Sequence, residues 1–308
     1  MSFRLPTVPV ELTPAEAADA IEAVLLAGFD PESAPPRTAV PVPAGELLLM
    51  PAATAAYAGV KIAGVAPANP AAGLPRITGS YLLLDGPTLQ PLALLDGAAL
   101  TALRTPAVTA VALRRLAVPE AAHLVLFGAG PQAYGHLDAL LAVRPLARVT
   151  VVARRSGPAL ELVAYARSLG LAAGRGEPAA VAGADLVVCC TTARTPLFDG
   201  GPVPAHAVVA AVGSHEPDAR EVDTALVRRA AVYVEARAVA EREAGDLIVP
   251  AGEGALRGKA APANLAELVR GEAPVPAGRP KLFKSVGMAW QDLAVAAEAY
   301  RRRGGPGH

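Results

Sequence analysis

The residues best suited to chemistry form a glycine-rich turn between an apolar run and a helical pattern. Residues 124–127 are apolar, and Gly128, Gly130 and Ala133 follow them at the spacing G-x-G-x-x-A. In a strand–turn–helix unit the first glycine permits the tight turn, the second lets the backbone approach a pyrophosphate, and the third small residue lets the helix pack on the strand. The first helical N–H groups then face the phosphates. We therefore predict that Gly128 and Gly130 bind a dinucleotide, in preference to a purely structural turn.

Two arginines and a serine follow the next apolar run and favour a phosphorylated cofactor. Residues 148–153 predict a second strand, at whose end an NAD-binding unit usually presents a carboxylate to the ribose 2′-hydroxyl. Arg154, Arg155 and Ser156 stand there instead. Guanidinium groups form charge-assisted bidentate pairs with phosphate. We predict that NADP(H) is preferred and NAD(H) possible; the alternative is that one or both arginines are solvated loop residues.

The elements that must position these residues alternate between strands and helices. Strands are expected at 184–192, 207–215 and 231–235, and helices at 160–169 and 222–229. This alternation is typical of a doubly wound parallel sheet of the Rossmann type. Thr191 and Thr192 end one strand, where the carboxyl ends of parallel strands meet a ligand crevice.

The first 110 residues have a different pattern. A helix is expected from Pro14, because Thr13 can cap it and proline suits the first helical position. Short runs with a period of two then predict an antiparallel sheet, followed by a long helix that carries Arg104 near its start. The chain from Lys284 to residue 303 predicts an amphipathic helix with Val286 on its apolar face. The expected strands are residues 37–42, 46–50, 57–63, 77–85 and 89–95, and the long helix is 98–116.

The composition excludes several classes of protein. The chain has 308 residues, 53% hydrophobic and 18% charged, with a formal net charge of zero, which argues against a nucleic-acid partner or an anionic membrane surface. Cys189 and Cys190 are adjacent, so they suit neither a mutual disulfide nor a metal site, and no metal is expected. The first six residues lack a signal-peptide pattern and no apolar run could span a bilayer. We expect a cytoplasmic protein.

Taken together and in order, these motifs resemble the ornithine cyclodeaminase/mu-crystallin family. The Thr-Ala-Leu-Arg-Thr and Lys-Ser-Val-Gly motifs are the most specific. The matching stretches are residues 50–52, 57–61, 96–109, 128–133, 212–221 and 284–292.

This resemblance implies a Rossmann dinucleotide-binding domain, residues 111–287, inserted into an α+β substrate-binding and dimerisation domain, residues 1–110 plus 288–308. It implies homodimers that form when the N-terminal sheets of two subunits join. The shared reaction step is hydride exchange between a nicotinamide and the α-carbon of a small imino or amino acid.

The resemblance also implies roles for individual residues. Arg37, Lys61 and Arg104 correspond to groups that hold the substrate carboxylate or orient the imine, and Lys61 could act catalytically by keeping the imine protonated. Without the resemblance, Lys61 would be interpreted as a solvated strand lysine and Arg104 as part of a helix-surface or interface ion pair. The implied cofactor contacts are Thr78, Arg104, Pro131, Gln132, Thr191 or Thr192, and Val286.

One position departs from the family pattern. Ornithine cyclodeaminases carry an aspartate where this chain has His215, and that carboxylate serves the second amine of the substrate. An imidazole suits an ornithinium poorly, although Glu216 could replace the carboxylate if the loop shifts by one residue. His215 could transfer protons, since histidine titrates near neutrality, or could simply cap a strand end. The leading hypothesis is thus a reductase of small cyclic imino acids (ketimines). The alternatives are an ornithine cyclodeaminase forming proline and ammonia, an amino-acid dehydrogenase, and a non-catalytic protein that binds a ligand together with NADPH.

Overall fold

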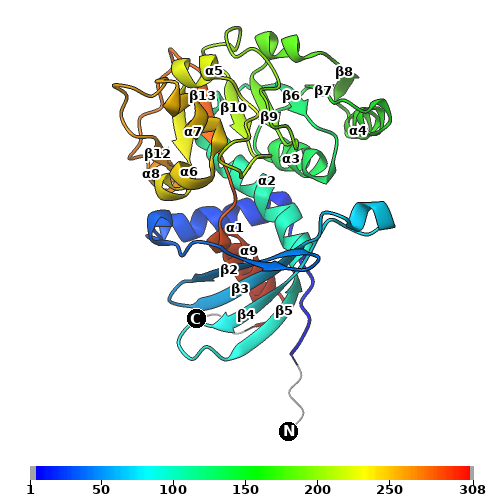
Figure 1. Cartoon of the computed structure of the whole chain (residues 1–308), viewed down its shortest axis with the longest axis vertical. Coiled ribbons are helices and arrows are strands. Elements are labelled where there is room, and N and C mark those ends of the chain that lie inside the picture. The colour runs from blue at the N-terminus through cyan, green and yellow to red at the C-terminus, as the bar shows by residue number, and fades with distance from the viewer. Residues whose placement is uncertain (1–4, 306–308) are drawn as a thin grey trace. The chain divides into compact units, whose positions relative to one another are not determined.

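The computed structural model describes residues 5–305 and divides the chain into two units (Figure 1). Unit 1 contains the chain up to Arg104 and from Met288 onward, and unit 2 is Thr105–Gly287. The division falls within the long helix α2 (Gly97–Leu116), close to the expected 98–116. Residues 1–4, which belong to the stretch that lacks a signal-peptide pattern, lie outside the described residues, as do residues 306–308.

Unit 1 is built on an antiparallel sheet, as its period-two pattern predicts. The strands follow the order β1-β2-β3-β4-β5. In this register Lys61 on β3 lies between Met50 on β2 and Tyr81 on β4. The strands are β1 Thr38–Val42, β2 Gly45–Ala53, β3 Tyr57–Val65, β4 Ile77–Asp85 and β5 Pro91–Asp96.

The two faces of this sheet have different surroundings. Helix α9 (Ala289–Arg302) lies against β2, β3 and β4 on one face, where Met50, Lys61 and Tyr81 are buried (Figure 1). Because side chains alternate along a strand, their neighbours point to the other face. There Leu47 and Ile62 are 37% and 43% exposed. The opposite face of the sheet is therefore open and exposes large apolar side chains.

Helix α1 (Pro14–Leu26) packs on α9 and begins as the sequence predicts. Pro14 holds the first helical position, and the Thr13 hydroxyl accepts a hydrogen bond from the Glu16 N–H. The Glu16 carboxylate in turn accepts one from the Thr13 N–H at 2.8 Å, which completes a capping box.

Unit 2 is a doubly wound parallel sheet, which confirms the predicted fold class. Its order is β12-β11-β13-β10-β9-β6-β7-β8. The direction of winding reverses between β6 and β9, where such sheets have their ligand crevice at the carboxyl ends of the strands. The strands are β6 His123–Phe127, β7 Arg148–Val152, β8 Ala172–Arg175, β9 Leu186–Cys189, β10 Val208–Ala211, β11 Ala231–Val234, β12 Ala263–Asn264 and β13 Lys281–Lys284.

The helices of unit 2 connect these strands, and its core contains Phe127 and Phe198, whose rings stack with centroids 5.0 Å apart. Within residues 5–305 no helix combines the length and the apolar character needed to cross a membrane. The helices are α3 Pro131–Leu141, α4 Ser156–Ser168, α5 Thr224–Arg229, α6 Arg237–Glu243, α7 Gly245–Gly252 and α8 Leu265–Val269.

The prediction of a helix from Lys284 onward is wrong at its start. Lys281–Lys284 is strand β13, which lies between β10 and β11, and helix α9 begins only at Ala289. Lys281 and Lys284 flank Leu282 and Phe283, so the sequence pattern does not indicate a buried strand, yet both lysines are buried. Val286 therefore lies in the connection between strand and helix. Strands β8 and β12 and helices α6, α7 and α8 were not predicted from the sequence.

Candidate functional site

The glycine turn of unit 2 has the geometry that its sequence suggests. Gly128 has φ = 109°, and a Cβ there would lie 2.7 Å from the Cys190 carbonyl oxygen, so only glycine fits. Gly130 directly precedes helix α3 and gives it no side-chain cap, and a Cβ there would meet no atom within 4 Å. The second glycine thus faces open space, where the backbone is accessible to a ligand. This is the opening that a pyrophosphate needs, so the turn fits a dinucleotide.

A cavity of about 1090 Å³ adjoins this turn at the carboxyl ends of β6, β7 and β9. It brings together many of the predicted cofactor residues, whereas Pro131 and Gln132 begin the neighbouring helix α3. The lining includes Gly128, Gly130, Arg154, Arg155, Glu177, Cys190, Thr191, Thr192 and Arg194.

A third arginine contacts the serine that follows the two predicted arginines. Arg175, the last residue of β8, donates a hydrogen bond to the Ser156 hydroxyl at 3.1 Å. Ser156 begins helix α4, directly after Arg154 and Arg155. In the described part of the chain, none of the three arginines forms an ion pair with a carboxylate. Arg175 is absent from the predicted site residues because the short strand β8 was not predicted.

Unit 1 carries a buried cluster of charged side chains around Lys61. The Lys61 ammonium group lies 2.9 and 2.8 Å from the two carboxylate oxygens of Asp292, and donates to the Thr101 hydroxyl at 3.1 Å. Arg104 donates to Gln291 Oε1 at 3.0 Å, and its Nε lies 3.5 Å from Asp292 Oδ1. Strand β3 and helices α2 and α9 therefore bring two cations to one carboxylate.

Burial gives Lys61 unusual acidity. Removal from water lowers the pKa of the Lys61 ammonium group to about 8, and the positive charges of Arg104 and Arg37 act in the same direction, while Asp292 opposes the shift. Arg37 directly precedes β1, and its positive charge acts on Lys61. A lysine with a pKa near neutrality can hold or release a proton under ordinary conditions.

Asp292 and Gln291 belong to this cluster, but the sequence analysis did not single them out. Both are completely buried, on the side of α9 that packs against the sheet. Their signal was available, since an adjacent amide and carboxylate interrupt an otherwise apolar helix face.

The structure does not bring Thr78 to this cluster. Thr78 pairs with Gly64 and Lys61 pairs with Tyr81, so the alternation of side chains places Thr78 and Lys61 on opposite faces of the sheet. Thr78 is exposed on the open face. Val286 lies in unit 2, where its N–H donates to Glu235 Oε2 at 2.8 Å.

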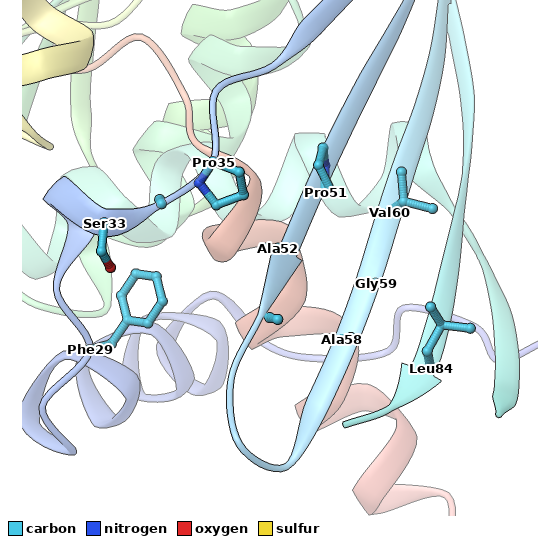
Figure 2. A pocket seen from close by; sticks show the side chains of 11 residues that line it. Phe29, Ser33, Pro35, Pro51, Ala52, Ala58, Gly59, Val60 and Leu84 are labelled. Atoms are coloured by element: carbon cyan, nitrogen blue, oxygen red, sulfur yellow. The ribbon is translucent and has the colours of Figure 1, made fainter. Parts of the chain in front are cut away.

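A smaller cavity of about 470 Å³ in unit 1 has little chemical character. Figure 2 shows its apolar walls, in which Ser33 supplies the one hydroxyl group. That hydroxyl already donates to the Asp30 carbonyl oxygen at 2.8 Å. The lining residues are Phe29, Ser33, Ala34, Pro35, Pro51, Ala52, Ala53, Ala58, Gly59, Val60 and Leu84.

Comparison with known proteins identifies the family. The sequence profile of the ornithine cyclodeaminase/mu-crystallin family matches residues 5–305. The chain belongs to this family. A Delta(1)-pyrroline-2-carboxylate reductase 2 of Burkholderia ambifaria is 36% identical over 280 residues, covering 88% of this chain and 86% of that protein. The ketimine reductase mu-crystallin of Mus musculus is 33% identical over 270 residues, covering 86% and 84%.

Solved structures of the ornithine cyclodeaminase/mu-crystallin family share the fold. The Delta(1)-pyrroline-2-carboxylate reductase of Thermococcus litoralis, solved in complex with NADH and L-proline, superposes with a TM-score of 0.89. It is 30% identical and covers 97% of each chain.

The family's cyclodeaminase position is occupied differently in this member. His215 lies exposed in the loop after β10. The Glu216 carboxylate, which could have replaced the missing aspartate, lies 2.5 Å from Arg194 Nη1, and Asp218 lies 2.6 Å from the other terminal nitrogen of Arg194. Both contacts are solvent-exposed. Glu216 is thus paired with a cation at the surface, which does not favour its service to a substrate amine.

Proposed function

We propose that this protein reduces a small cyclic imino acid at its C=N bond, using NAD(P)H. The observation that carries the proposal is the buried cluster of Lys61, Arg104 and Asp292, in a chain that also has a dinucleotide-binding turn at Gly128 and Gly130. Supporting it, relatives that cover most of the chain are named reductases of such compounds.

Arg104 and Arg37 bind the substrate carboxylate. A carboxylate taken from water needs fixed cations, and a guanidinium supplies two parallel donors. Gln291 holds Arg104 in place at 3.0 Å, so this cation is already oriented before substrate binds. Such positioning supplies much of the catalysis when two reactants must meet at a defined geometry.

Lys61 supplies the proton. When bound, the nicotinamide supplies two electrons as hydride to the imine carbon, and the nitrogen must be protonated for the carbon to accept them. The Lys61 ammonium group donates to that nitrogen. Asp292 keeps the ammonium group charged against the cost of burial and fixes its direction through two contacts of 2.9 and 2.8 Å.

NADP(H) is the preferred cofactor in this proposal. Arg154, Arg155 and Ser156 bind the 2′-phosphate, because no carboxylate neutralises either guanidinium within residues 5–305 and none stands at the end of β7 to accept a 2′-hydroxyl. NAD(H) remains usable, because the pyrophosphate turn serves both cofactors.

The protein forms a homodimer through the open face of the antiparallel sheet. Val40, Leu47, Ile62 and Leu94 are each more than a third exposed on these strands. An apolar face of this extent marks an interaction surface, and a second copy of the same face would cover it symmetrically.

The decisive experiment measures the absorbance of reduced nicotinamide with NADPH and a panel of cyclic imino acids. Consumption of NADPH supports the proposal, and Lys61→Met should bind NADPH normally but turn over at least a hundredfold more slowly. Ammonia released from L-ornithine with oxidised cofactor would indicate a cyclodeaminase instead. NADPH binding without either reaction would indicate a non-catalytic binding protein. Full turnover by Lys61→Met would remove the assigned role of Lys61.

A further inference from the structure

Three buried charged residues of unit 2 have no part in the chemistry described so far. Glu221, Asp246 and Lys284 are at most 1% exposed. Lys284 Nζ lies 2.7 Å from Asp246 Oδ2. Asp246 Oδ1 accepts hydrogen bonds from the backbone N–H groups of Glu221 at 2.6 Å and Val222 at 2.9 Å. We name these three residues the buried triad.

The triad joins the ends of three neighbouring strands, β9, β10 and β13. The Glu221 carboxylate accepts hydrogen bonds from the N–H and hydroxyl of Thr191, both at 2.8 Å, and from the Gly213 N–H at 2.7 Å. Lys284 donates to the Ser214 carbonyl oxygen at 2.6 Å. Of the residues that these contacts hold, Thr191 also lines the cavity.

The triad carries one surplus negative charge when its members are ionised, since two carboxylates face one ammonium group. Burial and the charge of Asp246 raise the pKa of Glu221, while the charge of Lys284 and the Thr191 hydrogen bonds act in the opposite direction. Both oxygens of Glu221 accept hydrogen bonds from three donors in all, and this bonding favours the ionised form. A buried charge that is not fully compensated destabilises the folded protein, so its presence calls for a reason beyond packing.

The direction in which the cofactor would lie supplies a reason for this buried charge. The arginines that would hold the 2′-phosphate follow β7, and the pyrophosphate turn follows β6, which is next in the sheet. Because a dinucleotide is linear, a cofactor held in this way extends its nicotinamide half toward the ends of β9 and β10, where Thr191 and Gly213 lie. The oxidised nicotinamide ring is a cation and the reduced ring is neutral.

We infer that the buried triad is a positioning and electrostatic element that strengthens binding of the oxidised cofactor relative to the reduced one. This rests on the proposed function, because it presumes that unit 2 holds a nicotinamide dinucleotide. Glu221 shapes the floor beneath the nicotinamide half through Thr191 and Gly213, and the surplus negative charge attracts the cationic ring. Lys284 and Asp246 hold Glu221 and limit that surplus to one charge.

The test is the ratio of the dissociation constants for NADP⁺ and NADPH, measured by calorimetry without substrate. Glu221→Gln and Asp246→Asn each remove a negative charge and should raise the ratio on the order of tenfold, as for a charge about 10 Å away at an effective dielectric constant of about 20. Lys284→Met should lower it. Glu221→Asp keeps the charge and should weaken the binding of NADP⁺ and NADPH equally. Glu161→Gln changes an exposed residue on α4 and should alter neither dissociation constant.

The outcomes separate the inference from the proposed function. Folding of each variant is checked by thermal unfolding, and the variants that fold decide the sign of the effect. Equal losses for both cofactor forms in Glu221→Gln or Asp246→Asn, or an altered ratio in Glu221→Asp, would overturn the inference while leaving the reductase intact. Failure of the wild-type protein to bind either form would instead overturn the proposed function.

Discussion

Lys61 and Asp292 form a buried ion pair, with two contacts of 2.9 and 2.8 Å, although 231 positions separate them in the sequence. Arg104, from a third element, approaches the same carboxylate at 3.5 Å. Breaking a buried pair by removing one partner leaves a charge without compensation, which typically costs about 3–5 kcal/mol. The pair therefore joins the proposed chemistry of Lys61 to the stability of unit 1.

The pair predicts how imine reduction depends on pH. Reduction needs the protonated Lys61, so kcat/KM should fall as the pH rises through about 8. Asp292→Asn removes the carboxylate that opposes the lowering of the Lys61 pKa, so this pKa should fall further. The decrease of kcat/KM should then occur at lower pH. Rate profiles of the two proteins check this, with Asp292→Glu as the charge-retaining control. A decrease that stays at the same pH in Asp292→Asn would show that Lys61 does not produce it.

Stability should respond to pH in the opposite sense. The pKa of Lys61 is about 8 in the folded protein, against 10.5 for the free side chain, so between these values the unfolded chain binds more protons. The contribution of Lys61 to the free energy of unfolding therefore rises as the pH increases from about 8 to 10.5. Denaturant titrations at several pH values give the free energy of unfolding of the wild type and of Lys61→Met. Between about pH 8 and pH 10.5 this free energy should rise more steeply with pH in the wild type than in Lys61→Met. If the free energy of unfolding depends on pH in the same way in both proteins, the pKa of Lys61 is not lowered.

Replacing the two glycines of the turn should affect different properties, stability for Gly128 and cofactor affinity for Gly130. Gly128→Ala forces a positive φ on alanine and places Cβ 2.7 Å from the Cys190 carbonyl oxygen, so it should destabilise the protein by roughly 1–3 kcal/mol. Gly130→Ala meets nothing in the protein, so it should fold normally and yet bind cofactor at least tenfold more weakly. Thermal unfolding and calorimetry separate the two effects. Undiminished cofactor affinity in Gly130→Ala would contradict the placement of the pyrophosphate.

The cofactor preference should depend on Arg154. Arg154→Asp replaces a phosphate partner with a carboxylate, so KM for NADPH should rise by roughly tenfold or more while KM for NADH changes little. Arg257→Asp, also an exposed arginine of unit 2 but outside the cofactor cavity, is the matched control. If the NADPH preference survives Arg154→Asp, the arginine is a solvated loop residue.

The open sheet face should govern the oligomeric state. Ile62 is 43% exposed in the middle of that face, and Ile62→Asp would place a charge within the proposed dimer contact. Sedimentation velocity should show a dimer for the wild type and a monomer for Ile62→Asp. Leu160→Asp changes a more exposed leucine on α4, 56% exposed, and should leave the dimer intact. A dimer that persists in Ile62→Asp would place the contact elsewhere.

Much of the fold follows from short stretches of sequence. The glycine turn, the Thr13 cap and the period-two strands of unit 1 depend on backbone conformation, hydrogen bonding and side-chain alternation among neighbouring residues. Strand β13 was not predicted because Lys281 and Lys284 interrupt its apolar pattern. They are buried there, and for Lys284 the partner is Asp246 on another element. Local pattern cannot report such a partner.

The sequence alone therefore determined the fold class and the strand–turn–helix unit that carries Gly128 and Gly130. Only the tertiary structure decided that Asp292 pairs with Lys61, that Arg175 reaches Ser156, and that Thr78 faces away from Lys61. Periodicity and capping depend on residues that are close in the chain. The partner of a buried charge depends instead on strand register and helix packing, which bring together residues more than two hundred positions apart.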